Sequence, residues 1–260
     1  MSLSLRMIVR IIRLSLKHPS VMFRFFSEMR AYNKANTRKD FHASMKNIFM
    51  CLSDWHDSAG SCGYYFWQDL WAARKIFQAK PSEHFDIGSR IDGFIAHVLS
   101  FMPITMIDIR PLPFEIENLK FIQADATNLE NISDNSIESL SSLCAPEHFG
   151  LGRYGDPIDP EACFNAMKAM QRVLKQGGHL YIAVPVGDEN SVAFNAHRIF
   201  KPELIIDTFN ELKLTDFSVF SDCKRQRGFF EHIDLKKFHE LNFGMDYSGS
   251  IVGLFELLKE

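Results

Sequence analysis

The chain has 260 residues, of which 46% are apolar and 23% are charged, and its net charge is −3. These values are typical of a soluble globular protein with a full hydrophobic core, and no stretch approaches the roughly 18 uninterrupted apolar residues that a membrane span requires. Five cysteines form an odd set without a CxxC pair. Neither a disulfide framework nor a zinc knuckle is therefore indicated, and a reducing compartment such as the cytoplasm is expected.

The first 50 residues differ in charge from the rest. They hold ten Lys or Arg against two acids, a balance of +8, whereas the remainder holds 19 against 30, a balance of −11. Four cations between Ser2 and Lys17 fall on one helical stripe beside apolar residues, which predicts a basic amphipathic helix. We expect a helical arm over residues 1–50 and an α/β domain over residues 51–260. The arm fits a peripheral contact with the inner membrane face or packing on its own domain or in a homodimer, and nucleic acid is not expected as a partner.

Beyond the arm, apolar strand patterns alternate with helical ones, which is typical of a parallel sheet covered on both faces. The predicted fold class is α/β, Rossmann-like and doubly wound, with a mostly parallel seven-stranded sheet. A QGG turn at Gln176–Gly178 is expected to end a helix, and the link 222–249 is expected to form a flap. The predicted strands are 84–87, 104–109, 120–123, 137–143, 179–184, 213–221 and 250–257, and the predicted helices are 64–77, 91–101, 161–174 and 202–212.

Three strands end on small or acidic residues: HFDIGSR around Gly88, ITMIDIR ending in Arg110, and FIQADATNL around Asp125. Ligands collect at the carboxyl edge of a doubly wound parallel sheet, where strands end beside helix starts. The three stretches therefore indicate a pocket for an adenosine-bearing molecule.

These strand ends, together with LKQGGHLYIAVP, resemble the class I S-adenosylmethionine-dependent methyltransferases from about Tyr64 to the C-terminus. Within that superfamily, the runs PEHFGLGRYGDPIDPE and FNAHRIFKPE resemble a little-characterised bacterial group of unknown function, often considered alongside surface-polysaccharide genes. The resemblance implies a methyltransferase whose cofactor is S-adenosyl-L-methionine.

The resemblance places Asp86, Gly88 and Ser89 at the methionine end of the cofactor, where a missing side chain allows close backbone approach. The usual motif has glycines at alternate positions, but here Ser89, Arg90 and Ile91 follow Gly88 before Gly93 arrives. Arg90 either pairs with the cofactor carboxylate or obstructs the pocket. A sheet that has kept its shape while its pocket has degenerated is the alternative.

The resemblance also assigns residues to the nucleoside. Asp108 would accept hydrogen bonds from both ribose hydroxyls, and Asp125 would take the adenine amino group. The Ala126 amide would donate to the ring, and Cys144 would pass near the methyl group. Each acid has a structural alternative, because strand-end aspartates also cap helices and turns.

Methyl transfer requires few obligatory side chains, with a base only where the acceptor must lose a proton. His148 is the best candidate for that base, beside Glu147, and His197 is a second candidate on the opposite wall with Asn195 and Arg198. Each histidine has an equally ordinary interpretation as a hydrogen-bonded structural residue.

The glycine-rich loop after this segment has its own candidates. Arg153, Tyr154 and Asp156 would recognise a polar acceptor such as a sugar, or would serve only to shape the turn. Glu147, His148 and Asp156 or Asp159 do not have the spacing of a ligand motif, so no metal is predicted.

The sequence therefore predicts O-methylation of a small or glycan-linked acceptor by an S-adenosylmethionine-dependent enzyme. A non-catalytic binding or scaffolding module on the same fold is the alternative. A nicotinamide-dependent oxidoreductase is disfavoured because no GxGxxG follows the first strand.

Overall fold

The computed structural model describes residues 19–46, 48–52, 62–244 and 246–260. The chain divides into two compact units, Met1–Ser61 and Cys62–Glu260. In the first unit, helix α2 (Pro19–Ala35) is followed by a short turn, η1 (Lys39–Phe41). The basic helix expected between Ser2 and Lys17 lies outside the described residues. Among the helices that are described, none is both long enough and apolar enough to cross a membrane.

The second unit alternates strands and helices in the predicted order. Its helical elements are α3 (Tyr64–Ala79), η2 (Ile91–Ile95), α4 (Ala96–Leu99), η3 (Pro146–His148), α5 (Ala162–Val173), α6 (Pro202–Thr208) and α7 (Leu235–Leu241). Its strands are β1 (His84–Ile87), β2 (Ile104–Asp108), β3 (Leu119–Gln123), β4 (Ile137–Leu143), β5 (Leu174–Pro185), β6 (Ser191–Ala193), β7 (His197–Ile199), β8 (Lys213–Ser221), β9 (Gly228–Phe230) and β10 (Ile251–Leu258).

The central sheet has the order β3-β2-β1-β4-β5-β10-β8-β9. Strands β1 to β5 pair in parallel, whereas β10 runs antiparallel to both β5 and β8. The predicted Rossmann-like, mostly parallel fold is confirmed, but the described sheet has eight strands instead of seven. The additional strand is β9, which pairs with the outer edge of β8. It lies in the link 222–249, which forms a short strand and helix α7 where only a flap was expected.

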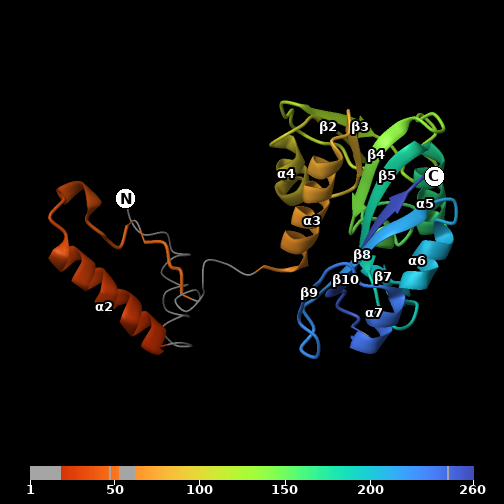
Figure 1. Ribbon diagram of the computed structural model, residues 1–260. Coiled ribbons are helices and arrows are strands. Elements are labelled where there is room, and N and C mark those ends of the chain that lie inside the picture. The colour runs from red at the N-terminus through yellow and green to blue at the C-terminus, as the bar shows by residue number, and fades with distance from the viewer. Residues whose placement is uncertain (1–18, 47, 53–61, 245) are drawn as a thin grey trace. The chain divides into compact units, whose positions relative to one another are not determined.

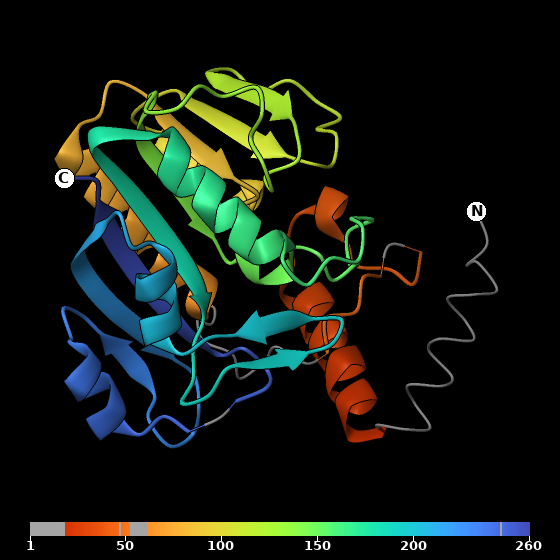
Figure 2. The same cartoon turned by 90° about the vertical axis from the view of Figure 1, so that its right-hand side faces the viewer.

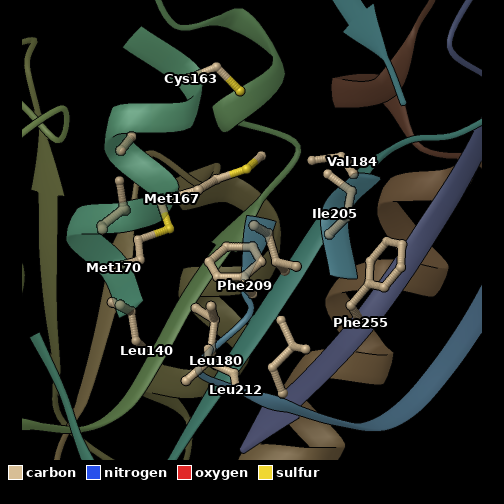
Figure 3. Close-up of a cluster of buried hydrophobic side chains, with 14 of the residues drawn as sticks. Leu140, Cys163, Met167, Met170, Leu180, Val184, Ile205, Phe209, Leu212 and Phe255 are labelled. Atoms are coloured by element: carbon tan, nitrogen blue, oxygen red, sulfur yellow. The ribbon is translucent and has the colours of Figure 1, made fainter. Parts of the chain in front are cut away.

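Helices cover both faces of this sheet, and side chains along one strand alternate between them. Figure 1 shows α3 and α4 on one face and α5 and α6 on the other, and Figure 2 looks onto the α5 face. On β5, Leu180 and Ile182 join the core under α5 and α6, while Tyr181 and Ala183 join the core under α3 and α4. Figure 3 shows the first of these cores, where Met167 of α5 is among the buried side chains. This alternation is the pattern of a strand buried on both faces.

Several predicted boundaries are confirmed to the residue, including those of β1 and β4. The predicted role of the QGG turn is wrong, because α5 ends at Val173 and Leu174 already has extended backbone. The two glycines lie inside β5, at a shift of its register against β4. A Cβ atom on Gly178 would come within 2.7 Å of the carbonyl oxygen of Lys175. The glycines therefore permit a local distortion of a strand, not the end of a helix.

The aromatic centre of the α5 face provides a test of this packing. Phe255 of β10 is fully buried and stacks on Phe217 of β8 with ring centroids 4.7 Å apart. Phe255→Ala should lower the free energy of unfolding by about 3 to 5 kcal/mol, because truncation leaves a cavity that the packed rings cannot fill. Urea denaturation measures this change. Phe114, 55% exposed, is the matched control, and an equal loss in Phe114→Ala would contradict the assignment of the core.

Candidate functional site

A cavity of about 400 Å³ opens at the carboxyl ends of β1 to β4. Its walls come from the loops after these four strands, from the start of α5 and from one residue of α3. The lining includes nine of the site residues selected from the sequence. These are Gly88, Asp108, Asp125, Ala126, Cys144, His148, Arg153, Tyr154 and Asp156.

Gly88 lies where the loop after β1 comes close to the loop after β4. Its φ of +71° lies in the left-handed region, and a Cβ atom added there would meet the Ala145 side chain at 3.0 Å. Its amide donates to the Ile107 carbonyl at 2.9 Å. A residue without a side chain is therefore required, and it leaves backbone exposed to the cavity.

Asp86 and Ser89 lie behind this wall instead of lining it. The Asp86 carboxylate is fully buried and accepts hydrogen bonds from the Ser89 amide at 2.9 Å, the Ser89 hydroxyl at 2.7 Å and the Ser141 hydroxyl at 2.5 Å. Burial raises the pKa of Asp86 to about 6, although these hydrogen bonds lower it. The two residues thus fix the loop that carries Gly88, and the structure does not bring either side chain into the cavity.

Arg90 borders the cavity without closing it. Its guanidinium forms two hydrogen bonds with Asp92, at 2.9 and 2.6 Å, and lies 4.7 Å from the centre of the Tyr65 ring. Both members of the ion pair are more than half exposed. The two positions that are usually glycine in this motif therefore form a surface ion pair, and the cavity persists beside it.

Asp108 and Arg110 form a second ion pair at the end of β2. One carboxylate oxygen of Asp108 accepts from the Arg110 amide at 2.8 Å and from Nε at 3.1 Å, and the other accepts from Nη2 at 2.9 Å. Asp108 is nearly buried, with 9% of its side chain exposed, whereas Arg110 is 52% exposed. Arg110 was not selected from the sequence, although its position two residues after the acid was a usable signal.

The strand-end residues of β3 and β4 complete this side of the cavity. Asp125 is exposed and accepts from the Thr127 amide at 2.8 Å, and Ala126 is almost buried. Cys144 has a left-handed backbone, and its thiol donates to Gln68 at 3.0 Å. Burial raises the pKa of Cys144 well above that of an ordinary thiol. The residue is therefore a neutral part of the wall and not a nucleophile.

His148 presents one ring nitrogen as a proton acceptor. Its Nδ1 lies 2.6 Å from the Ala196 carbonyl oxygen, and since a carbonyl only accepts, Nδ1 carries the proton. Burial lowers the pKa of His148 to about 4, so the ring is neutral at pH 7. The lone pair of Nε2 is therefore available for a hydrogen bond, as a general base requires.

Glu147 precedes His148 in the chain but does not line the cavity. Its side chain is 2% exposed, and one carboxylate oxygen is 3.7 Å from His148 Nε2. The other, Oε2, is buried without a hydrogen-bond partner among the described residues. Burial raises the pKa of Glu147 to about 8, so the carboxyl group is protonated at neutral pH.

The three candidates from the FNAHRIF run lie on the β6–β7 hairpin and outside the cavity lining. Asn195 is exposed near its tip. Arg198 donates to the backbone carbonyls of Glu147, Phe149 and Pro160 at 3.3, 2.7 and 3.2 Å, which ties the hairpin to the loop after β4. Arg198 therefore acts on the site through backbone that it holds in place.

His197 is also on this hairpin and has its own surroundings. Its ring centre is 6.4 Å from that of His148. Its Nε2 is buried without a hydrogen-bond partner among the described residues, and a Cβ atom on Gly249 would come within 2.9 Å of it. Burial lowers the pKa of His197. The ring thus packs against Gly249 and lies outside the cavity lining.

Asp156 shapes the loop between β4 and α5. Its carboxylate accepts from the amides of Gly150, Gly152 and Tyr154 at 2.7, 3.4 and 3.2 Å. A carboxylate that collects three backbone donors organises a turn, and this favours the structural interpretation of Asp156.

Tyr154 and Arg153 stand at the mouth of the cavity. The Tyr154 ring lies 4.6 Å from the Arg110 guanidinium and 5.2 Å from that of Arg153, and it meets the His148 ring edge to face at 5.4 Å. Arg153 also donates to the Ala196 carbonyl at 3.1 Å. A polar acceptor would therefore meet cations and a hydroxyl-bearing ring at the entrance.

The described residues contain no group of three or more His, Cys, Asp or Glu side chains that could hold a metal ion. The carboxylates of Asp156 and Asp108 are instead occupied by backbone amides and by Arg110.

Comparison with solved structures identifies the fold. A proposed sarcosine dimethylglycine methyltransferase from Galdieria sulphuraria is 13% identical, with a TM-score of 0.50 over 74% of this chain and 85% of that one. The fold is that of the class I S-adenosylmethionine-dependent methyltransferases. A search of curated proteins finds no match.

Two further structures are similar at slightly lower scores. The 1,6-didemethyltoxoflavin N1-methyltransferase of Burkholderia thailandensis, solved with bound 1,6-didemethyltoxoflavin and S-adenosylhomocysteine, is 14% identical, with a TM-score of 0.49 over 80% of this chain and 81% of that one. The N-methyltransferase NodS of Bradyrhizobium japonicum, solved with S-adenosylhomocysteine, is 11% identical, with a TM-score of 0.48 over 75% and 87%.

Residues 116–234 match the model of a family described as Caenorhabditis protein of unknown function, DUF268. The match covers less than half of the chain, but it contains the loop with Arg153 and the hairpin with His197. Its description gives no support to a bacterial group or to surface-polysaccharide genes, so that part of the resemblance stays a prediction.

The buried carboxyl group of Glu147 predicts a pH dependence of stability. Its pKa in the folded protein is about 8, above the ordinary value of 4.5, so the native state holds a proton that the unfolded chain releases in this window. The free energy of unfolding should therefore fall as pH rises from 4.5 to 8, with a contribution from this group of up to about 1.4 kcal/mol per pH unit. Glu147→Gln should remove that contribution, as measured by urea unfolding across the window.

Glu115, which is exposed, provides the control. Glu115→Gln should keep the pH dependence of the wild type. If Glu147→Gln kept it as well, the proton would have to be held elsewhere.

Proposed function

We propose that this protein is an S-adenosylmethionine-dependent methyltransferase that acts on an oxygen of a small or glycan-linked acceptor. The observation that carries the proposal is the placement of Asp108 and the neutral His148 on the walls of one cavity at the carboxyl edge of the sheet. An acid after the second strand suits a ribose, and an unprotonated imidazole nitrogen suits an acceptor hydroxyl.

The residues present fit the proposed cofactor. A volume of about 400 Å³ lies within the range of small-molecule sites, roughly 300 to 1,000 Å³. Gly88 offers backbone without a side chain to the methionine end, Asp108 accepts from the ribose, and Asp125 and Ala126 face the adenine in the proposed arrangement. When bound, the cofactor would supply an electrophilic methyl group.

His148 would receive the proton that an acceptor hydroxyl loses. Its Nδ1–H is engaged by the Ala196 carbonyl, which fixes the tautomer and leaves Nε2 as the base. Arg153 and Tyr154 at the cavity mouth would hold a hydroxyl-rich acceptor, since guanidinium and phenol groups both donate hydrogen bonds. An in-line displacement needs little more than this positioning and a base.

A non-catalytic binding or scaffolding module is the second candidate. Two observations favour it: Arg90 and Asp92 replace the usual glycines, and the carboxylate of Asp108 is already bonded to Arg110. Turnover would be absent in such a module, although its fold would be the same.

Calorimetric titration with S-adenosylhomocysteine tests the cofactor assignment. We expect the wild type to bind and Asp108→Ala to bind about tenfold or more weakly, because hydrogen bonds to a charged carboxylate contribute on the order of 1.5 to 3 kcal/mol. Asp134→Ala removes an exposed acid outside this cavity and should bind as the wild type does. If millimolar ligand produced no heat and no thermal shift in the wild type, that result would favour the scaffold.

The rate of transfer tests His148. We expect His148→Gln to lower kcat by about 100-fold or more with little change in S-adenosylhomocysteine affinity, because a general base contributes to the chemical step. The low pKa of His148, about 4, also predicts that kcat has no acidic limb near the usual histidine pKa of about 6.5. A lysate-derived acceptor and labelled cofactor provide the assay. An unchanged kcat in a folded variant would remove the base assignment.

A further inference from the structure

The geometry around Asp108 points to a second function for this carboxylate. We propose that Arg110 is an internal competitor for the carboxylate that binds the ribose, and that it thereby sets the affinity of the cavity for nucleosides. The inference rests on the proposed function, since it takes the ribose site from it. It concerns a residue that lines the cavity and that the resemblance to methyltransferases leaves without a role.

The competition follows from the number of hydrogen bonds that a carboxylate can accept. Each oxygen has two lone pairs, and Oδ1 of Asp108 already accepts two donors, the Arg110 amide and Nε. Oδ2 accepts one, from Nη2. A ribose diol that bonds to both oxygens therefore has a place on Oδ2 but none on Oδ1. The Arg110 side chain must release Oδ1 before both hydroxyls can bind.

The Tyr154 ring also contacts the side chain of Arg110. Its guanidinium lies 4.6 Å from the centre of the Tyr154 ring, within the distance of a cation–π contact. Tyr154 in turn meets His148, and its amide donates to Asp156. Displacement of Arg110 by a ribose would therefore loosen a contact of the acceptor loop, so that nucleoside binding and the position of Tyr154 become linked.

The ion pair after β1 resembles the Asp108–Arg110 pair, but its acid is far more exposed to water. Arg90 also forks onto an acid two residues away and also lies over a tyrosine ring. Its acid, Asp92, is 68% exposed, whereas Asp108 is 9% exposed. Water can replace Arg90 on Asp92, but the nearly buried Asp108 depends on a donor from the protein or from a ligand.

Titration with two nucleosides tests the inference on the full-length protein. Adenosine carries the 2′- and 3′-hydroxyls that would bind Asp108, and 2′,3′-dideoxyadenosine lacks both. Arg110→Met keeps a long apolar side chain but removes the fork, so we expect it to bind adenosine about fivefold more tightly than the wild type, in line with the strength of a partly exposed ion pair. The affinity for 2′,3′-dideoxyadenosine should not change. Tyr154→Leu should tighten adenosine binding by a smaller factor, because it only loosens Arg110.

Arg227→Met is the matched control, since Arg227 forms an ion pair with Asp222 outside the cavity. It should bind both nucleosides as the wild type does. Unchanged or weaker adenosine binding by Arg110→Met, or equal tightening of both nucleosides, would overturn the inference and leave the proposed function intact. Failure of the wild type and of every variant to bind adenosine would overturn the proposed function as well.

Discussion

The reversal of strand order between β1 and β4 is the constraint on which this site depends. The chain lays β1, β2 and β3 outward in one direction and then returns to place β4 against the other side of β1. In doubly wound sheets the loops that leave the two sides of such a point turn to opposite faces and leave a crevice between them. Gly88 and Ala145 mark that point here. The position of the cavity follows from topology before any side chain is considered.

Two buried acids near this point differ in how many hydrogen-bond donors their carboxyl groups have. Asp86 is fully enclosed, but its carboxylate accepts donors from Ser89 and Ser141, which offset the cost of removing it from water. Glu147 is almost as deeply buried, and one of its oxygens has no partner among the described residues. The hydrogen bonds of Asp86 account for its burial. Glu147 has no comparable set of donors, so burial keeps its carboxyl group protonated beside His148.

The sequence predicted the elements better than the contacts. The predicted bounds of β1 and β4 agree with the structure to the residue, although both strands mix apolar residues with buried polar ones, as in HFDI and IESLSSL. The glycines at Gly177 and Gly178 were assigned to a helix end because a strand distortion has the same local signature. Arg198 could not be interpreted correctly, since its partners are backbone carbonyls far away along the chain. Local sequence patterns predict the element in which a residue lies, whereas the contacts of its side chain depend on the tertiary structure.

The charge state of the wall after β4 fits the proposed reaction. Burial leaves Cys144, Glu147 and His148 all neutral at pH 7. Methyl transfer from a sulfonium disperses a positive charge, so an anion beside the sulfur would stabilise the reactant more than the transition state and slow the reaction. The neutral thiol of Cys144, which lines the cavity, avoids that penalty. The protonated Glu147 leaves His148 without an anionic partner that would raise its pKa. The burial that is costly for folding thus keeps the proposed base unprotonated and this part of the wall uncharged.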